Sequence, residues 1–93
     1  MKKNVIFAFR GDPLCFVHVL LNGIDLHERG REGLIVIEGD AVTLIPKMAA
    51  PDHFLHGLYE KAKAMGILYG ACRACSAKLK VDKDIEKENI PLM

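Results

Sequence analysis

The sequence predicts a three-layer α/β/α fold in which helices flank a mostly parallel sheet. Strand-like apolar runs alternate with helix-like segments along the chain. The runs are continuously apolar, which is typical of strands buried on both faces of a parallel sheet. With 93 residues, the chain is short enough to form one domain, residues 1–93.

The first strand is predicted at residues 4–9, NVIFAF, where we expect both faces to be covered. A helix follows, with Asp12 as its N-cap and Pro13 as its first residue. Apolar residues at helical spacing carry it as far as Ile24, and it ends before Gly30. A second buried strand is expected within residues 33–39, GLIVIEG.

The rest of the chain repeats the alternation. A short helix over residues 40–45 is interrupted by Pro46, and another over residues 54–65 places Phe54 on its apolar face. Residues 67–71, ILYGA, form the third predicted strand. A further helix starts at residues 74–80, and the charged tail is helix-compatible without another strand.

Composition excludes several classes of protein. Hydrophobic residues make up 51% of the chain, which fits a packed domain that also buries surface against copies of itself. The net charge of +1, with both signs interspersed, gives no sign of a nucleic-acid partner. The apolar runs are too short for a signal peptide or a membrane span. Three cysteines without an export signal are read as reduced thiols in a cytoplasmic protein.

Candidate functional residues gather at the carboxyl edge of the predicted sheet, where open parallel sheets bind ligands. Arg10 follows the first strand, Glu38 ends the second, and Cys72 follows the third. Cys15, in the first turn of the first helix, is expected on the same edge, so all three cysteines should lie on one side. No nucleotide fingerprint is present, and no cofactor is predicted.

The motif CRAC places Cys72 at the start of a helix and Cys75 one turn inside it. A helix N-terminus and the neighbouring Arg73 would both favour the Cys72 thiolate, the nucleophilic form. The alternative is that Cys72 is a small buried residue that ends a strand. Cys75 is either a resolving thiol or a packing residue. The candidate anion- or substrate-binding residues around the pair are Arg10, Arg73, Cys15 and Glu38.

Two other interpretations of the cysteine pair remain open. A CxxC motif beside a βαβ pattern is known from thioredoxin-like redox proteins, although this chain has no tryptophan. His53 and His56 with Cys72 and Cys75 would also make a tetrahedral zinc set. We expect the two histidines to face solvent, which disfavours that set.

Three segments resemble the DsrE/DsrF-like sulfur-relay family, which includes TusD-type proteins. They are NVIFAFRGDPLCFVHVLLNGIDLHERG, IVIEGDAVTLI and GILYGACRACSAK, within residues 4–80. The resemblance implies a flavodoxin- or Rossmann-like topology and assembly into homo- or hetero-oligomers. It also implies that Cys72 accepts sulfur as a persulfide from a donor protein and passes it to a cysteine of an acceptor protein.

The chain departs from that family at its C-terminal end. Relatives continue with another helix and a final strand, whereas this sequence stops at NIPLM. Without that strand one edge of the sheet would be open, so we expect a partner or the tail to cover it.

Overall fold

The computed structural model describes residues 3–93, so Met1 and Lys2 of the basic start lie outside the described part. The strands β1 (Lys3–Ala8), β2 (Glu32–Ile37) and β3 (Leu68–Ala71) form one parallel sheet in the order β1-β2-β3. β1 and β2 pair without interruption, and a bulge interrupts the pairing of β2 with β3. The predicted mixed α/β class is confirmed, and the fold is compatible with a three-layer α/β/α arrangement.

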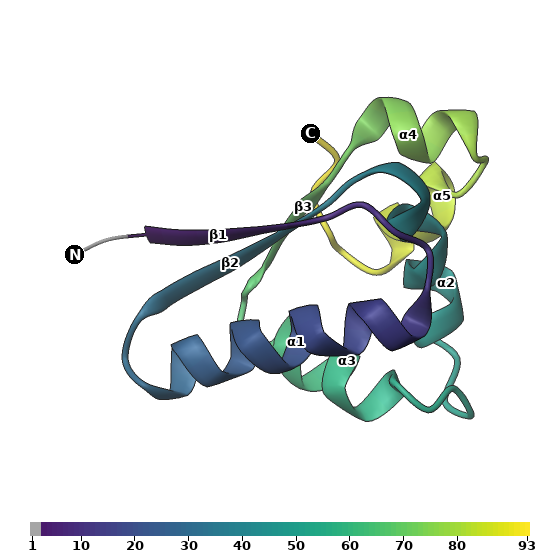
Figure 1. Ribbon diagram of the computed structural model, residues 1–93. Helices are drawn as coiled ribbons and strands as arrows, with labels where there is room; N and C mark the ends of the chain where they lie inside the picture. Colours follow the sequence, from purple (N-terminus) through teal and green to yellow (C-terminus); the bar gives the residue numbers. More distant parts are fainter. Residues whose placement is uncertain (1–2) are drawn as a thin grey trace.

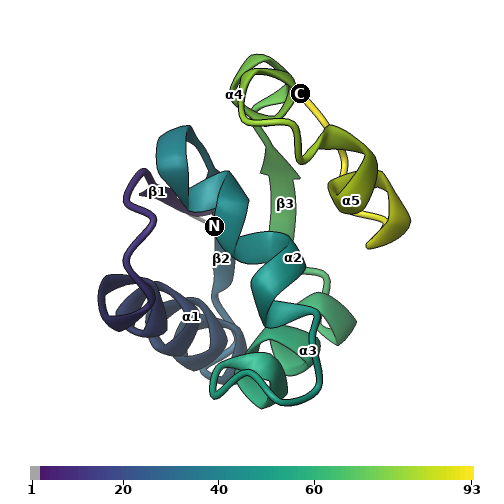
Figure 2. The ribbon, with the colours of Figure 1, turned by 90° about the vertical axis from the view of Figure 1, so that its right-hand side faces the viewer.

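The helices lie mainly on one face of this sheet. They are α1 (Pro13–Glu28), a 3-10 turn η1 (Gly39–Thr43), α2 (Leu44–Met48), α3 (His56–Ala64), α4 (Arg73–Lys78) and α5 (Asp82–Lys87). α1 and α3 pack together beneath the sheet, while α4 lies above its carboxyl end (Figure 1). With strands in the order 1-2-3, right-handed crossovers place their helices on the same face. α5 packs against α2 and α4 (Figure 2).

The start of α1 is as the sequence predicts. Asp12 is the N-cap, its Oδ1 accepts the N–H of Leu14 at 2.9 Å, and Pro13 is the first helical residue. Pro46, however, lies inside α2 instead of interrupting the helix. It is the third residue of α2, and an N–H there has no acceptor within the helix, so proline removes no helical hydrogen bond.

The helix predicted from residue 54 begins two residues later, which corrects its apolar face. Phe54 precedes α3 and is 64% exposed, whereas Leu55 and Tyr59 are fully buried. The chain from residue 49 to 55 is a series of turns, so the helical periodicity that placed Phe54 in the core does not apply there.

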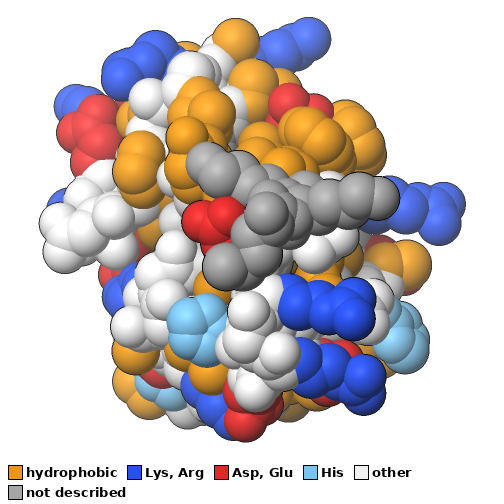
Figure 3. Space-filling model, turned by 90° about the vertical axis from the view of Figure 1, so that its left-hand side faces the viewer, with side chains coloured by type: hydrophobic (Ala, Val, Ile, Leu, Met, Phe, Trp, Pro, Cys, Tyr) orange, Lys and Arg blue, Asp and Glu red, His pale blue; other side chains and the backbone are white. Residues whose placement is uncertain are grey.

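β1 is covered on one face only, which corrects the prediction for residues 4–9. Ala8 is buried on the side of α1, but Val5 and Phe7 on the opposite side are 44% and 53% exposed. Phe9 continues this row, since its ring stacks on Phe7 with centroids 6.4 Å apart. In Figure 3 hydrophobic side chains gather mainly in the upper half of the view, with charged side chains at its margins and across the lower half.

The tail adds no further strand within the described residues, as predicted, but a single bridge pairs it with the sheet. Leu92 forms a parallel bridge with Ala71. The Ala71 N–H donates to the Pro91 carbonyl and the Met93 N–H donates to the Ala71 carbonyl, both at 2.8 Å. The sequence left a partner or the tail as the cover of the open sheet edge, and in the structure the tail covers β3.

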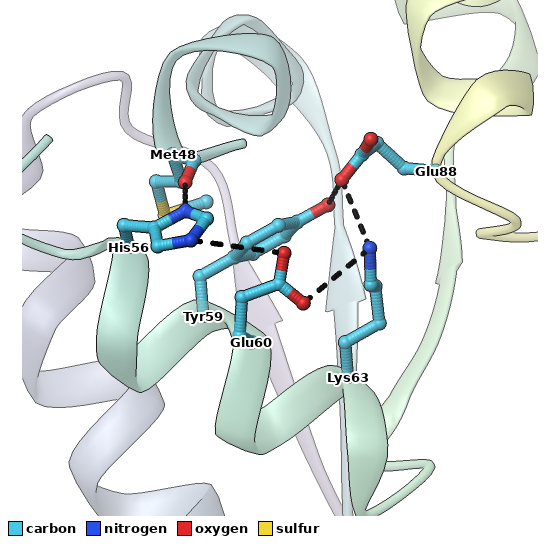
Figure 4. A network of polar contacts seen from close by, with 6 residues as sticks. All are labelled: Met48, His56, Tyr59, Glu60, Lys63 and Glu88. Carbon is cyan, nitrogen blue, oxygen red and sulfur yellow. Dashed lines mark hydrogen bonds and ion pairs between the residues drawn. The ribbon is translucent and has the colours of Figure 1, made fainter. Parts of the chain in front are cut away.

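A polar network fastens the tail to the core (Figure 4). The hydroxyl of Tyr59, a fully buried residue on α3, donates to Glu88 Oε1 at 2.6 Å. Lys63, one turn further along α3, donates to the same oxygen at 3.0 Å. Glu88 directly follows α5, so these contacts join α3 to the end of α5. No helix among the described residues is long and apolar enough to cross a membrane.

Candidate functional site

Cys72 occupies the N-cap of α4, as the sequence predicts, with an extended backbone at φ −63° and ψ 119°. Its N–H donates to the Ile37 carbonyl at 2.8 Å, which attaches it to the carboxyl end of β2. Its Sγ accepts the Cys75 N–H at 3.4 Å. The side chain is half-buried, so the sulfur is held by the backbone and still has access to solvent.

Cys75 lies in the first turn of α4 and faces the turn that follows β2. Its Sγ accepts the N–H of Gly39 at 3.4 Å, and it packs against the edge of the hydrophobic core. Cys75 is therefore both a packing residue and the immediate neighbour of Cys72. Both roles that the sequence left open are compatible with this position.

The pKa values of the two thiols are shifted in opposite directions. A hydrogen bond from the Cys75 thiol, followed by that from the Cys75 N–H, lowers the pKa of Cys72. The same thiol–thiol bond raises the pKa of Cys75. Cys72 therefore ionises first, with Cys75 as its proton-bearing donor. A thiolate beside a thiol can attack a sulfur electrophile, and the pair can close to a disulfide.

Glu38 affects the pair through its charge, and Arg73 next to Cys72 also contacts the tail. The charge of Glu38 raises the pKa of both cysteines, so this carboxylate opposes anion binding at the pair. The Arg73 guanidinium donates to the Leu92 carbonyl at 3.3 Å, and its backbone N–H donates to the Met93 carbonyl at 2.9 Å. Arg73 thus holds the tail, and the hydrogen bonds around Cys72 come from Cys75 and the backbone.

Arg10 and Cys15 line a separate cavity of about 260 Å³ between the end of β1 and the start of α1. The Cys15 thiol donates to Asp12 Oδ2 at 3.8 Å, a long contact. Within residues 3–93 the structure records no contact between Cys15 and either of the other cysteines. α1 and α4 both begin just after the carboxyl end of a strand, and Cys15 lines a cavity to which Cys72 and Cys75 do not contribute.

His53 and His56 are half-buried and bonded locally, which corrects the expectation that they face solvent. His53 Nδ1 accepts the Leu55 N–H at 3.1 Å, and His56 Nδ1 lies 2.9 Å from the Met48 carbonyl oxygen. In the described part of the chain, no three His, Cys, Asp or Glu side chains are grouped as metal ligands. The structure therefore does not bring the candidate zinc set together.

Sequence reasoning missed two residues that position the pair. Gly39 supplies the N–H to Cys75 and has a φ of +55°, a conformation that favours glycine. Its place between a strand end and Asp40 was a usable signal for a turn. Ser76, the one buried polar residue recorded in the described chain, donates its hydroxyl to the Cys72 carbonyl at 2.7 Å. A serine one turn after an N-cap carries no comparable signal.

Comparison with known proteins identifies relatives in two archaea. An uncharacterised protein of Archaeoglobus fulgidus is 47% identical over 45 residues, which are 48% of this chain and 72% of that protein. The chain belongs to the family of this archaeal protein. An uncharacterised protein of Methanocaldococcus jannaschii is 31% identical over 70 residues, 75% of this chain. The match covers 55% of that relative, so the chain spans little more than half its length.

The other two comparisons found no match. No family model matches the chain, and no solved structure is significantly similar to it.

Proposed function

We propose that this protein is a sulfur carrier of the DsrE/DsrF-like type and that Cys72 is its sulfur acceptor. The observation that carries the proposal is the arrangement of the cysteine pair. The Cys72 sulfur accepts hydrogen bonds from Cys75, its pKa is lowered, and its side chain is half-buried. These features suit a thiol that must be nucleophilic and accessible to the cysteine of another protein.

The proposed reaction exchanges one sulfur–sulfur bond for another. The Cys72 thiolate attacks the terminal sulfur of a donor persulfide, R–S–SH. A bond forms between Cys72 Sγ and that sulfur, the donor S–S bond breaks, and the donor leaves as a thiolate. An acceptor thiolate later attacks the terminal sulfur in the same way, and Cys72 is regenerated. No net oxidation takes place in either transfer.

The partners of this reaction would be a donor and an acceptor protein that each present a cysteine. Further copies of the chain are also expected from the resemblance. The chain needs its thiols reduced for this chemistry, so we propose that it works in the reducing environment of the cytoplasm.

Intact-protein mass spectrometry after anaerobic incubation with a cysteine desulfurase and cysteine tests the proposal. A reducible adduct of one sulfur atom should form on Cys75→Ser and on the double variant Cys15→Ser and Cys75→Ser, the matched control. It should be absent from Cys72→Ser. If every variant carries the adduct equally, or none carries it and none releases sulfide, Cys72 is not a sulfur acceptor.

A thiol–disulfide redox protein is the second candidate, because the Cys75 N–H donates to Cys72 Sγ at 3.4 Å and the two cysteines are therefore neighbours in space. Oxidised glutathione would then convert the chain to its disulfide in the absence of any sulfur donor. That result, together with failure to take up sulfur from the desulfurase, would favour the redox function over the carrier.

A further inference from the structure

The neighbour of Cys72 has a geometry that a simple carrier does not need. The cysteines are separated by three positions at the start of a helix, where Cβ atoms lie about 5–6 Å apart. Disulfides span Cβ atoms about 3.5–4.5 Å apart, so closure of this pair needs a small approach of Cys72, which is the N-cap and lies outside the helix proper. The Cys75 N–H donates to Cys72 Sγ at 3.4 Å, and Gly39 donates its N–H to the Cys75 sulfur at 3.4 Å.

We infer, on the basis of the proposed function, that Cys75 reduces a persulfide on Cys72 and releases sulfide. In the reaction the Cys75 sulfur attacks Cys72 Sγ. A bond forms between the two cysteine sulfurs, the bond from Cys72 Sγ to the terminal sulfur breaks, and that sulfur leaves with the Cys75 proton as HS⁻. The terminal sulfur is reduced, and the two cysteine sulfurs are oxidised to a disulfide.

The hydrogen bonds around Cys75 explain why it attacks only after Cys72 has been loaded with sulfur. While Cys72 is empty, Cys75 keeps its proton and acts as the hydrogen-bond donor. Once sulfur is loaded, the negative charge moves from Cys72 Sγ to the terminal sulfur, which can then take the Cys75 proton. The Gly39 N–H remains 3.4 Å from the Cys75 sulfur and favours its anionic form during the attack. Repeated turnover would need an external dithiol to reduce the disulfide.

The test is an anaerobic single turnover with glutathione persulfide as the donor, with sulfide and intact mass followed together. The wild type and Cys15→Ser should release about one sulfide per chain and lose the mass of two hydrogens, which follows from the balanced step above. Cys75→Ser should instead retain the sulfur adduct and release little sulfide. A parallel sample without donor excludes oxidation by other routes.

The outcomes separate this inference from the proposed function. If the wild type holds its adduct as long as Cys75→Ser does, the inference is overturned and the carrier stands. If neither protein takes up sulfur and the wild type forms neither sulfide nor disulfide, the carrier itself is overturned. If Cys75→Ser releases sulfide as fast as the wild type, another group performs the reduction and the inference is again wrong.

A second inference rests on a different observation, the uncovered face of the sheet. We call this the open face and define it by the in-register positions Val5, Phe7, Leu34, Val36 and Gly70, with Phe9 and Met93 beside them. Val5 and the two phenylalanines are 44–57% exposed, and Met93, which lies against Gly70, is 59% exposed. Figure 3 shows hydrophobic side chains mainly in the upper half of its view.

The size and charge of the open face favour a second copy of the chain as its partner. The exposed side chains leave on the order of 400 Å² of apolar surface in water, within the range of patches that are functional on monomers. Each partner of a standard interface contributes roughly 800 Å², of which somewhat more than half is apolar. None of these five positions is charged, and the exposed Glu32, two residues before Leu34, lies at the margin of the patch, so the apolar centres of two such faces meet without like-charge repulsion.

The geometry points to a two-fold dimer in which the open faces of two copies pack against each other. A two-fold axis brings the same patch of both copies together, which an uncharged apolar face permits. Parallel sheets are normally covered on both faces, and the second copy would supply the cover that α1 and α3 provide on the first face.

Sedimentation velocity over a wide range of protein concentration tests this dimer. The wild type should dimerise, and Phe7→Ser should weaken the association about tenfold or more, as expected for a buried aromatic anchor. Phe54→Ser is the matched control, because Phe54 is 64% exposed on the turn before α3, away from the open face. It should dimerise like the wild type.

Three results would overturn the dimer. A wild type that stays monomeric at every concentration has no such interface, and equal weakening by Phe54→Ser would place the interface elsewhere. Unchanged association of a folded Phe7→Ser would also contradict it. If circular dichroism shows that Phe7→Ser does not fold, Phe9→Ser gives the same test, since Phe9 lies beyond the end of β1.

Discussion

At the scale of single residues, Gly39 shows how the sheet and the cysteine pair depend on one backbone position. Its φ of +55° lies in the left-handed region, and a Cβ there would lie 3.0 Å from the Phe9 carbonyl oxygen. Its N–H also donates to the Cys75 sulfur. The chain therefore turns after β2 in a way that a larger residue would strain.

Gly39→Ala should destabilise the protein by about 1–2 kcal/mol, the cost of a left-handed conformation for an L-residue. Gly57→Ala is the control, because a Cβ at Gly57, near the start of α3, meets nothing within 4 Å. That substitution should be neutral or stabilise by up to about 1 kcal/mol. Urea unfolding of both variants measures the difference, and an unchanged midpoint for Gly39→Ala would contradict the argument.

The acidity of Cys72 gives a second prediction at this scale. Because the Cys75 thiol is the main cause of the lowered pKa of Cys72, Cys75→Ala should raise that pKa. The rate of iodoacetamide alkylation at Cys72, followed by peptide mass spectrometry in a Cys15→Ser background, should then rise only at higher pH. Cys75→Ser keeps a hydroxyl donor and should lie between the two. Identical profiles for all three proteins would show that Cys75 does not set the acidity of Cys72.

At the scale of elements, the tail acts as the cover of β3. A Cβ at Gly70 would displace the Met93 side chain and lie 3.2 Å from the Pro91 carbonyl oxygen, so glycine lets the tail approach β3 closely. Arg73 adds contacts to the Leu92 and Met93 carbonyls from the start of α4. The helix that carries the cysteines is thus attached to the same segment that closes the sheet edge.

Gly70→Ala should loosen this attachment, since the added methyl group displaces Met93. The Met93 and Ala71 amides, which hold the bridge, should exchange with deuterium roughly tenfold faster, a change comparable to the net worth of one hydrogen bond. The double substitution Gly70→Ala and Met93→Ala removes most of the collision and should recover much of the protection. Equal exchange in Gly70→Ala and the wild type would show that the tail does not depend on this contact.

At the scale of the whole molecule, the Tyr59–Glu88 hydrogen bond joins the helical layer to the C-terminal segment. The Tyr59 hydroxyl bond, followed by that from Lys63, lowers the pKa of Glu88. A lowered pKa means that the folded state favours the carboxylate, so this stabilisation is present above the unfolded pKa of about 4.3 and is lost as the pH falls. Burial, followed by the bond to Glu88, raises the pKa of Tyr59, so stability should also fall above pH ~10.

Tyr59→Phe should cost about 1–2 kcal/mol at neutral pH, as expected for a hydrogen bond to a charged group. The difference from the wild type should shrink as the pH falls below the unfolded-state pKa of about 4.3 and towards the lowered pKa of folded Glu88. Tyr69→Phe is the control, because Tyr69 is 51% exposed and should contribute little through its hydroxyl. Urea unfolding at both pH values gives the comparison. A cost that does not depend on pH would show that the charge of Glu88 is not involved.

Part of this molecule could be predicted from local sequence signals. Asp12 and Pro13 mark the start of α1 because capping and the fixed φ of proline are local effects. Cys72 is the N-cap of α4 because a β-prone run changes there to a helix-like stretch. The incorrect predictions of burial have one physical cause. Three apolar residues that were predicted to be buried are exposed, namely Val5, Phe7 and Phe54. Local sequence does not determine which apolar side chains pack against another helix or strand.

The sequence by itself determined the α/β class, the parallel strands and the position of the cysteine pair, because hydrophobic periodicity and capping act within one turn or one strand. Only the tertiary structure decided that Cys15 lines a cavity of its own, that the tail covers β3, and that one face of β1 stays open. These features depend on the order of the strands and the handedness of the crossovers, which place distant segments together or apart.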